Sequence, residues 1–405
     1  MTEKYSFPKG FLWGAATSAH QVEGGNHNDW TEWELNNAER LSREAERRFG
    51  HLPHWAEIQK DAENPANYIS GRACDHYNRF REDFDIAKSL GHNAHRFSIE
   101  WSRIEPGEGK FDEKEIEHYR EVIRALRERS MEPFVTLWHW TIPTWLRDKG
   151  GVMAFDFPRL FSRYAAYVVD QFPEVKFWMT LNEPTSAIVN SYFLGIWPPQ
   201  KRGILKTLRA YWNLAMAHSC AYKEIKKVNK SAQVGFGNIL SYCEPYSKNL
   251  LDIIATKFVD FWSNILFLRL TGNAHDYLTL QYYFHYKIKF PGIRNENKKV
   301  SDMGWELYPD GIYHLLKRLS KYKKPIYITE HGLADTKDLY RAWYISESLK
   351  RIARAIKEGI DIRGYFHWSL LDNFEWDKGF WPRFGLVEID YKTLERKIRP
   401  SALEY

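Results

Sequence analysis

The stretch KFWMTLNEP (residues 176–184) shows how this chain is organised: an apolar run of strand length stops at a polar turn that carries Glu183. Such a run, bounded by turn residues, is typical of a buried strand. The stretch IYITEHG (residues 326–332) has the same design and ends with Glu330. Each stretch therefore predicts a buried strand with a carboxylate at its carboxyl end.

Six further runs of this kind are spread over the chain, and long amphipathic segments separate them. The predicted strands cover residues 12–19, 94–100, 133–138, 176–181, 233–239, 277–282, 326–329 and 363–368. The clearest predicted helices cover residues 113–129, 158–171, 205–228, 311–321 and 339–358. This alternation, with no linker rich in Pro, Gly or Ser, favours an α/β fold in which residues 1–405 form one closed (β/α)₈ barrel domain. A doubly wound sheet is the alternative, although no G-x-G-x-x-G motif follows the first strand.

Two segments depart from the alternation. Residues 36–67 are a charged insertion after the first strand. We expect it to be partly helical and to lie over the barrel mouth, although a solvated surface excursion fits equally well. The chain ends at Tyr405, where a helix should follow the eighth strand, so the last helix is expected to be short or missing.

Composition limits where the protein works and what it binds. The mean hydropathy is −0.56 and no apolar run approaches the roughly 20 residues that span a bilayer, so no membrane partner is expected. The opening residues MTEKYSFPKGFLWG lack the pattern of a secretory signal, which favours the cytoplasm. Three widely spaced cysteines suggest free thiols. The net charge of +6 is dispersed, so no nucleic-acid partner is expected.

The two strand-end glutamates form a candidate catalytic pair. In barrels of this kind catalytic groups lie at the carboxyl ends of the strands. Strands four and seven lie on different sides of the barrel, so Glu183 and Glu330 can face each other, as the carboxyl groups of a glycosidase do. One must be protonated and the other ionised. Arg96, on the second strand, would keep its neighbour charged, and we predict that this neighbour is Glu330.

The remaining strand ends are polar or aromatic, as the wall of a sugar pocket would be. Amide, imidazole, phenol and carboxylate groups can bind vicinal hydroxyls, and indole rings can pack on the apolar face of a sugar. Taken alone, His139 fits a satisfied core histidine equally well, and Glu375 fits a surface charge. The candidates at these ends are Gln21, His139, Trp140, Asn182, Tyr283, Trp368, Glu375 and Trp376.

Eight stretches of the sequence form a series of known motifs. In order, they are FLWGAATSAHQVEG, CDHYNRF, HRFSIEWSRIEP, TLWHWTIPTWL, TLNEP, GWELYPDGIY, PIYITEHGLAD and GYFHWSLLDNFEWDKGFWPRFGLVEID. On these stretches the sequence resembles, over nearly its whole length, glycoside hydrolase family 1, the β-glucosidase and β-galactosidase family. Eight motifs in the family's order are a specific signal.

The resemblance implies retaining hydrolysis of terminal β-D-glycosyl residues of small β-glycosides or oligosaccharides, with no metal or organic cofactor. It implies that Glu183 is the acid/base and that Glu330 is the nucleophile, about 5 to 5.5 Å apart. Tyr283 would hold the nucleophile and Arg96 would be its charged neighbour. The implied sugar-binding residues are Gln21, His139, Trp140, Asn182, Glu375 and Trp376, with Trp368 as a stacking platform.

The chain departs from the family pattern beside both catalytic positions. The family usually has Asn where this sequence has His331, and Asn where it has Gln281. The family also tends to be longer between residues 244 and 275, which predicts a more open side for the leaving group. Two other readings stay open: a barrel that binds sugar with little or no hydrolysis, and a metal-dependent hydrolase, for which the histidines are poorly spaced.

Overall fold

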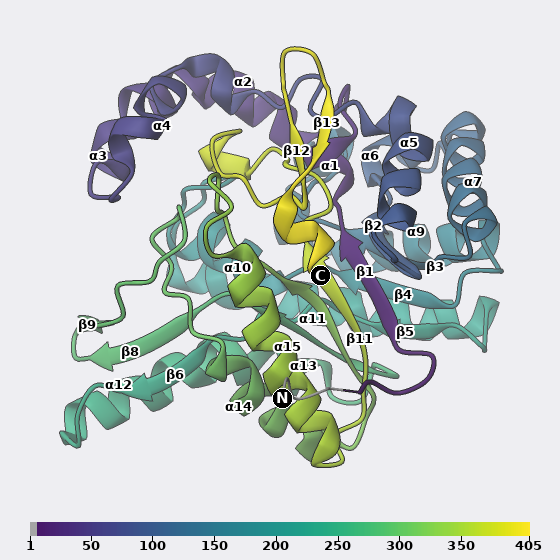
Figure 1. Cartoon of the computed structure of the whole chain (residues 1–405). Helices are drawn as coiled ribbons and strands as arrows, with labels where there is room; N and C mark the ends of the chain where they lie inside the picture. The colour runs from purple at the N-terminus through teal and green to yellow at the C-terminus, as the bar shows by residue number, and fades with distance from the viewer. Residues whose placement is uncertain (1–5) are drawn as a thin grey trace.

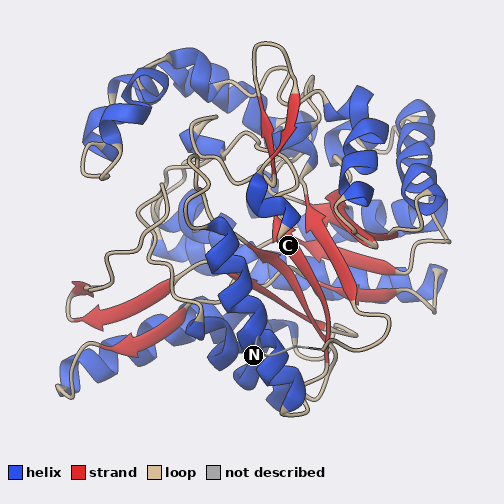
Figure 2. Cartoon of the chain, viewed as in Figure 1, coloured by secondary structure: helices blue, strands red, loops and turns tan. Residues whose placement is uncertain are grey.

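The computed structural model describes residues 6–405, and a parallel eight-stranded sheet forms its centre (Figures 1 and 2). Residues 1–5, which open the stretch without a signal pattern, lie outside the described residues. The strand order is β5-β4-β3-β2-β1-β11-β10-β7. The strands are β1 (Leu12–Ala16), β2 (Ala94–Ser98), β3 (Glu132–Trp138), β4 (Phe177–Leu181), β5 (Gln233–Gly235), β7 (Leu278–Tyr282), β10 (Ile326–His331) and β11 (Ile362–Trp368).

The segment that follows β5 pairs with β7, the other outer strand of this order, and so closes the barrel. Ile239 and Gln281 form a parallel bridge. The N–H of Gln281 donates to the carbonyl of Asn238 (2.9 Å), and the N–H of Leu240 donates to the carbonyl of Gln281 (3.0 Å). Regular pairing of β5 stops at Gly235, earlier than predicted. Beyond it, the N–H of Gly237 still donates to the carbonyl of Leu181 (2.7 Å), and the carbonyl of Gly237 accepts from the N–H of Glu183 (3.0 Å). The prediction of a (β/α)₈ barrel is confirmed.

Helices surround this barrel on the outside (Figure 2). The five predicted helices correspond to α7 (Glu113–Glu128), α9 (Phe157–Gln171), α11 (Ile204–Val228), α14 (Asp310–Leu319) and α15 (Arg341–Lys357), with ends shifted by at most two residues. Within the described part of the chain, no helix has the length and apolar character needed to cross a membrane. Apart from the insertion after β1, further α-helices are α1 (Ala19–Val22), α5 (His76–Ser89), α6 (Trp101–Ile104), α8 (Thr144–Asp148), α10 (Pro184–Ile188), α12 (Leu250–Asp260) and α13 (Leu266–Thr271).

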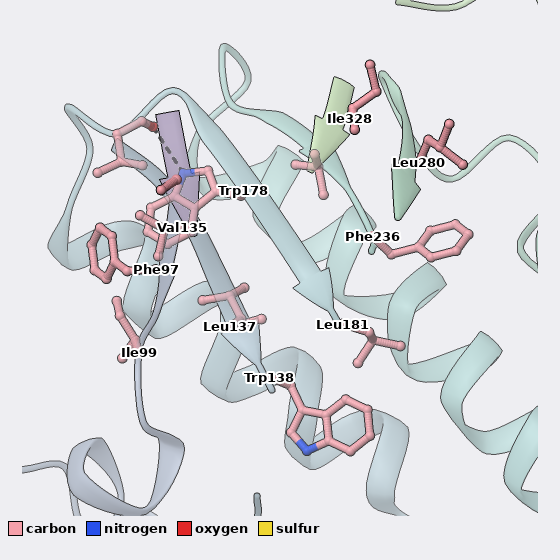
Figure 3. Packing of buried hydrophobic residues seen from close by; sticks show 14 of the residues in the cluster. Phe97, Ile99, Val135, Leu137, Trp138, Trp178, Leu181, Phe236, Leu280 and Ile328 are labelled. Carbon is pink, nitrogen blue, oxygen red and sulfur yellow. Dashed lines mark hydrogen bonds between the residues drawn. The ribbon is translucent and has the colours of Figure 1, made fainter. Parts of the chain in front are cut away.

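Alternation along the strands divides the core into two layers. Val135 and Leu137 of β3 and Phe97 of β2 belong to the large cluster between the strands and the helices (Figure 3). Their neighbours Phe134 and Ala94 point into the barrel, where a separate aromatic cluster fills the interior. This filled interior leaves the carboxyl ends of the strands as the place for a pocket.

The insertion after β1 is helical and begins earlier than predicted. It consists of α2 (Asp29–Arg43), α3 (Ala45–Phe49), α4 (Trp55–Ala62) and the 3₁₀ turn η1 (Pro65–Tyr68). Figure 1 shows these helices at the end of the molecule toward which β1 points. Trp30 and Trp33 of α2 pack with Trp197 and Trp376. The insertion therefore supports a wall of the barrel mouth.

No α-helix follows β11 among the described residues, as the sequence indicated. The chain forms the hairpin β12 (Val387–Ile389) and β13 (Arg396–Ile398) and ends in the 3₁₀ turn η7 (Pro400–Leu403). Tyr405 fills the space outside β1 and β11: its hydroxyl donates to the Gly14 carbonyl (2.6 Å), and its ring lies 5.6 Å from that of Tyr365.

A second, small sheet projects from the barrel beside α12 (Figure 1). It contains β6 (Tyr242–Pro245), β8 (His285–Lys289) and β9 (Gly292–Ile293). These elements follow β5 and β7 directly, so they extend outward from the mouth of the barrel.

Candidate active site

Glu183 and Glu330 both line one pocket of about 240 Å³ at the carboxyl ends of the barrel strands. Glu183 follows β4 in the left-handed conformation (φ 39°, ψ 60°), and Pro184 then begins α10. A non-glycine residue in this region is strained, and such strain clusters at functional sites. The N–H of Glu183 donates to the carbonyl of Gly237 (3.0 Å), which fixes the turn.

Glu330, near the end of β10, accepts hydrogen bonds from one residue of β2, one residue of β7 and the residue that follows β7. Arg96 Nη1 of β2 contacts Glu330 Oε1 in a buried ion pair. Gln281 Nε2 of β7 donates to the same oxygen (2.7 Å), and the Tyr283 hydroxyl donates to Oε2 (2.8 Å). Each of these bonds favours the ionised carboxylate. The predicted contact between Arg96 and Glu330 is therefore present.

Asn182 joins the two sides of the pocket. Its Oδ1 accepts from Arg96 Nη2 (2.6 Å) and from Gln281 Nε2 (2.8 Å), and its Nδ2 lies 3.0 Å from His139 Nε2. Its carbonyl accepts from Trp140 Nε1 (2.8 Å). Asn182, which directly precedes Glu183, thus contacts two of the groups that hold Glu330.

The two carboxyl groups have different electrostatic surroundings. Burial raises the pKa of Glu183 well above its ordinary value, and the nearby charge of Glu330 raises it further. Burial also raises the pKa of Glu330 above its ordinary value, but the Arg96 guanidinium and the Tyr283 hydroxyl oppose this rise. For Glu183 the Ser186 hydroxyl (2.9 Å) is the hydrogen-bond donor within the described residues. Glu183 therefore holds a proton more readily than Glu330 does.

The remaining predicted sugar-binding residues line the same pocket. These are Gln21, His139, Trp140, Asn182, Tyr283, Trp368, Glu375 and Trp376. Gln21 Nε2 donates to the Phe374 carbonyl (2.8 Å) and lies 3.4 Å from Glu375 Oε2. Burial raises the pKa of Glu375 to about 8. A carboxyl group that is partly protonated near neutral pH can both donate to and accept from sugar hydroxyls.

Tryptophan rings form one side of the pocket. The ring of Trp376 lies 4.7 Å from that of Trp140 and 4.6 Å from that of Trp30 of the insertion. The ring of Trp368, at the end of β11, lies 5.9 Å from His139 in a stacked arrangement. Burial and the charge of Arg96 hold the pKa of His139 well below its ordinary value, so this ring is neutral.

Several residues that line the pocket were not among the site residues predicted from the sequence. They are Ser186, Asn190, Trp197, Ile239, Phe284, Trp305, Lys378 and Phe384. Ser186 follows Glu183 by one helical turn, a spacing that places two side chains on the same face. Most of the others lie on loops beyond the strand ends, where no periodic pattern indicates direction.

The two departures from the family pattern have different surroundings. Gln281 points inward and binds Glu330 directly. His331 points away from the pocket toward α15: its Nδ1 lies 2.8 Å from the Tyr365 hydroxyl, and its Nε2 lies 3.2 Å from the Ser348 hydroxyl. Burial lowers the pKa of His331 to about 3, so it stays neutral over the ordinary pH range.

Within the described residues, no three His, Cys, Asp or Glu side chains gather in a way that could hold a metal ion. The mouth of this closed parallel barrel presents two buried carboxyl groups in unlike surroundings, amid indole rings and amides. This arrangement defines a glycoside hydrolase.

Comparison with known proteins gives the family. The sequence model of the family described as "Glycosyl hydrolase family 1" matches residues 3–281 and 273–405 of this chain. The chain is 34% identical to beta-glucosidase A of Thermotoga maritima, over 98% of this chain and 96% of that protein. It superposes with a TM-score of 0.86 on a beta-glycosidase from Pyrococcus horikoshii (34% identity, 98% and 93% coverage). The TM-score is also 0.86 for the Thermotoga maritima beta-glucosidase in complex with glucoimidazole (31% identity, 99% and 97% coverage). This chain belongs to glycosyl hydrolase family 1, and it is a glycoside hydrolase.

Proposed function

We propose that Glu330 is the nucleophile and Glu183 the acid/base of a retaining β-glycosidase that releases terminal β-D-glycosyl residues. The observation that carries the assignment is the unequal environment of the two carboxyl groups. Glu330 is bound by Arg96, Gln281 and Tyr283, all of which favour its charged form. Glu183 is buried beside that charge, which favours its protonated form.

In the first step the Glu330 carboxylate attacks the anomeric carbon and forms an ester bond to the sugar. The bond from that carbon to the leaving oxygen breaks, and the proton of Glu183 goes to this oxygen. The Arg96 contact keeps the attacking oxygen ionised until it reacts. Transfer of the proton removes the charge that the departing alcohol would otherwise carry.

In the second step water attacks the anomeric carbon and the ester bond to Glu330 breaks. Glu183, now ionised, takes a proton from that water and is ready for the next cycle. Two successive displacements at one carbon return the β configuration. The acid and base roles of Glu183 follow from one position in the pocket, because the leaving alcohol and the incoming water occupy the same side.

The glycone is expected to lie between the indole rings and the polar groups opposite them. Gln21, Asn182, His139 and Glu375 offer donors and acceptors to ring hydroxyls, and Trp368 offers an apolar face. The relative with glucoimidazole bound supports glucosyl substrates. We extend the proposal to galactosyl and related β-glycosides, because a pocket of this composition does not by itself select one sugar.

Cellular setting and assembly belong to the same proposal. We propose a single-domain enzyme of residues 1–405 that works in the cytoplasm on small β-glycosides without a cofactor and without a nucleic-acid partner. The three cysteines, Cys74, Cys220 and Cys243, are unpaired, which suits a reducing compartment.

Steady-state hydrolysis of a panel of aryl β-glycosides tests the assignment. Glu183→Gln should lower kcat/KM by about 10²- to 10⁴-fold, the contribution of a general acid, and Glu330→Gln should lower it to the background rate. Glu306→Gln is the matched control, because this buried glutamate bonds to His285 and lies outside the pocket lining. Full activity in either active-site variant would refute the role assigned to that residue.

A further inference from the structure

The first half of α11 presents an apolar stripe to solvent. Ile204, Leu208 and Trp212 are exposed at successive helical turns, and Leu205 beside them is 82% exposed. Spacing of four residues places these side chains on one face of the helix. Isolated exposed apolar side chains are common, but a contiguous patch usually marks an interaction site.

The stripe continues onto the turn before α11, which forms part of the pocket rim. Phe193, Leu194 and Ile196 are exposed there. The N–H of Gly203 donates to the carbonyl of Tyr192 (2.8 Å), which holds this turn against the start of the helix. Residues on either side of the turn line the catalytic pocket, namely Asn190 and Trp197.

The neighbouring helix α12 is inverted relative to an ordinary surface helix. Two of its polar residues, Asp252 and Thr256, are buried. Asp252 accepts from the Ser247 hydroxyl (2.7 Å) and from the N–H of Phe290 (3.0 Å). Inward-facing polar groups fully satisfied in this way leave the apolar side of the helix to face outward.

That outward side carries four exposed apolar residues: Leu250, Leu251, Ile254 and Phe258. Phe258 is 63% exposed, and its ring lies 6.0 Å from that of Trp262. The Trp262 ring lies 5.9 Å from that of Tyr211 of α11. Trp262 belongs to the π-helical turn η4 (Phe261–Ile265) that follows α12, so this turn links the end of α12 to α11. We call the exposed apolar residues of α11, its preceding turn and α12 the basic–apolar surface.

The charges on this surface have one sign. Residues 184–223 contain no Asp or Glu, and the single acid in residues 245–259 is the buried Asp252. The exposed cations are Lys201, Arg202, Lys206, Arg209, Lys248 and Lys257. Within the part of the chain that the structure describes, none of these six side chains forms a salt bridge or a side-chain hydrogen bond.

We propose that the basic–apolar surface docks on an anionic lipid bilayer and holds the enzyme at a membrane surface with its pocket rim beside the lipid. An interfacial helix inserts its apolar face to the depth of the headgroups, while flanking Lys and Arg bind anionic lipid. No spanning segment is needed, so the proposal is compatible with the low hydropathy of the chain and replaces the sequence expectation of no membrane partner.

The charge pattern argues against the other occupants. A second copy related by two-fold symmetry would bring the same patch against itself, so that unpaired cations would face cations. A nucleic acid would use the cations but would leave the leucines, isoleucines and Phe258 in water. A lipid surface of negative charge satisfies both features at once.

Co-sedimentation with vesicles tests the proposal on the full chain. The enzyme should pellet with vesicles of phosphatidylcholine mixed with phosphatidylglycerol at low ionic strength, and should stay in solution with phosphatidylcholine alone. Lys206→Gln with Arg209→Gln should weaken binding about 30-fold, at about 1 kcal/mol per basic residue. Leu205→Ser with Leu208→Ser, and Ile254→Ser with Phe258→Ser, should each weaken it at least about tenfold.

Matched controls use equally exposed residues outside this surface. Leu339→Ser with Leu403→Ser, and Lys88→Gln with Lys114→Gln, should bind vesicles like the unaltered enzyme. All variants should keep the unaltered kcat/KM on a small aryl glucoside, which shows that they fold. The proposal is overturned if the enzyme does not pellet with anionic vesicles, if the surface variants bind as well as the controls, or if sedimentation velocity shows instead a dimer that the leucine variants dissolve.

Discussion

Replacement of Tyr283 by Phe tests how Glu330 is kept ionised. The Tyr283 hydroxyl donates to Glu330 Oε2 at 2.8 Å in a buried site, and the substitution removes this one bond without changing the shape of the ring. A hydrogen bond to a charged group contributes about 1.5–3 kcal/mol. One pKa unit corresponds to about 1.36 kcal/mol. The loss should therefore raise the pKa of Glu330 by about 1–2 units.

The sign of the effect on catalysis follows from the role of Glu330. The bond stabilises the carboxylate, so its loss favours the protonated form, which cannot attack the sugar. The acidic limb of the pH profile of kcat/KM should move to higher pH by about 1–2 units. Because Glu183 and Glu330 interact, this limb reports the lower apparent pKa of the pair.

The assay is steady-state hydrolysis of an aryl β-glucoside across the pH range in which the enzyme stays folded. Tyr282→Phe is the control, because the neighbouring Tyr282 hydroxyl donates to the carbonyl of Tyr308 (2.6 Å) and lies outside the pocket lining. An unmoved limb in Tyr283→Phe, a limb moved to lower pH, or an equal shift in Tyr282→Phe would refute the reasoning.

Three further outcomes are expected. His331→Asn should leave the pH profile of kcat/KM unchanged, because His331 is neutral and faces α15. It should lower the free energy of unfolding by about 1–3 kcal/mol, because buried hydrogen bonds are lost. A shifted pH profile would place His331 in the catalytic machinery. Asp83→Asn should destabilise the protein by about 3–5 kcal/mol at neutral pH, because Asp83 is buried between Arg396 (2.8 Å) and His76 (2.7 Å). Those partners lower the pKa of Asp83, so this stability is present above the unfolded pKa and is lost as pH falls through the folded pKa; denaturant titrations that show an equal difference at all pH values would contradict it. Dialysis against a chelator should leave kcat/KM unchanged, and activity restored only by added metal would revive a metal-dependent mechanism.

Much of the fold could be predicted from periodicity, because buried parallel strands and amphipathic helices leave different patterns in the sequence. The fifth strand was predicted to run to residue 239, but its regular pairing ends at Gly235, and only separate backbone bonds, such as Gly237 to Leu181, continue beyond it. The end of regular pairing depends on the neighbouring strands and leaves no local signal. The start of α2 was also missed. Its apolar face packs on Trp197 and Trp376, far away in the sequence, so its burial depends on tertiary contacts.

The site was predictable where a residue lies at a strand end and not where it lies beyond one. Glu183, Glu330 and Arg96 follow from barrel geometry, whereas Trp305 and Phe384 reach the pocket from loops. Sequence alone could not tell the directions of His331 and Gln281. Both lie near the ends of adjacent strands, yet one faces α15 and the other faces the nucleophile. The register of β10 with β7 shifts between Ile328 and Glu330, and this irregular pairing affects the direction in which the side chains point. Such a shift depends on the packing of the whole barrel and not on the local sequence.

The outward-facing side of α12 could not be predicted from its composition. Its sequence reads as an ordinary apolar core helix, and only the burial of Asp252 and Thr256 shows which side faces outward.

Trapping of the glycosyl-enzyme tests the division of roles between Glu183 and Glu330 most directly. A 2-deoxy-2-fluoro-β-glucoside with a good leaving group forms the ester quickly and loses it slowly, so the modified protein accumulates. Mass spectrometry of the digested protein should find one sugar on the peptide that contains Glu330, and none in Glu330→Gln. A sugar on the peptide that contains Glu183, or turnover with no trapped ester, would contradict the assignment.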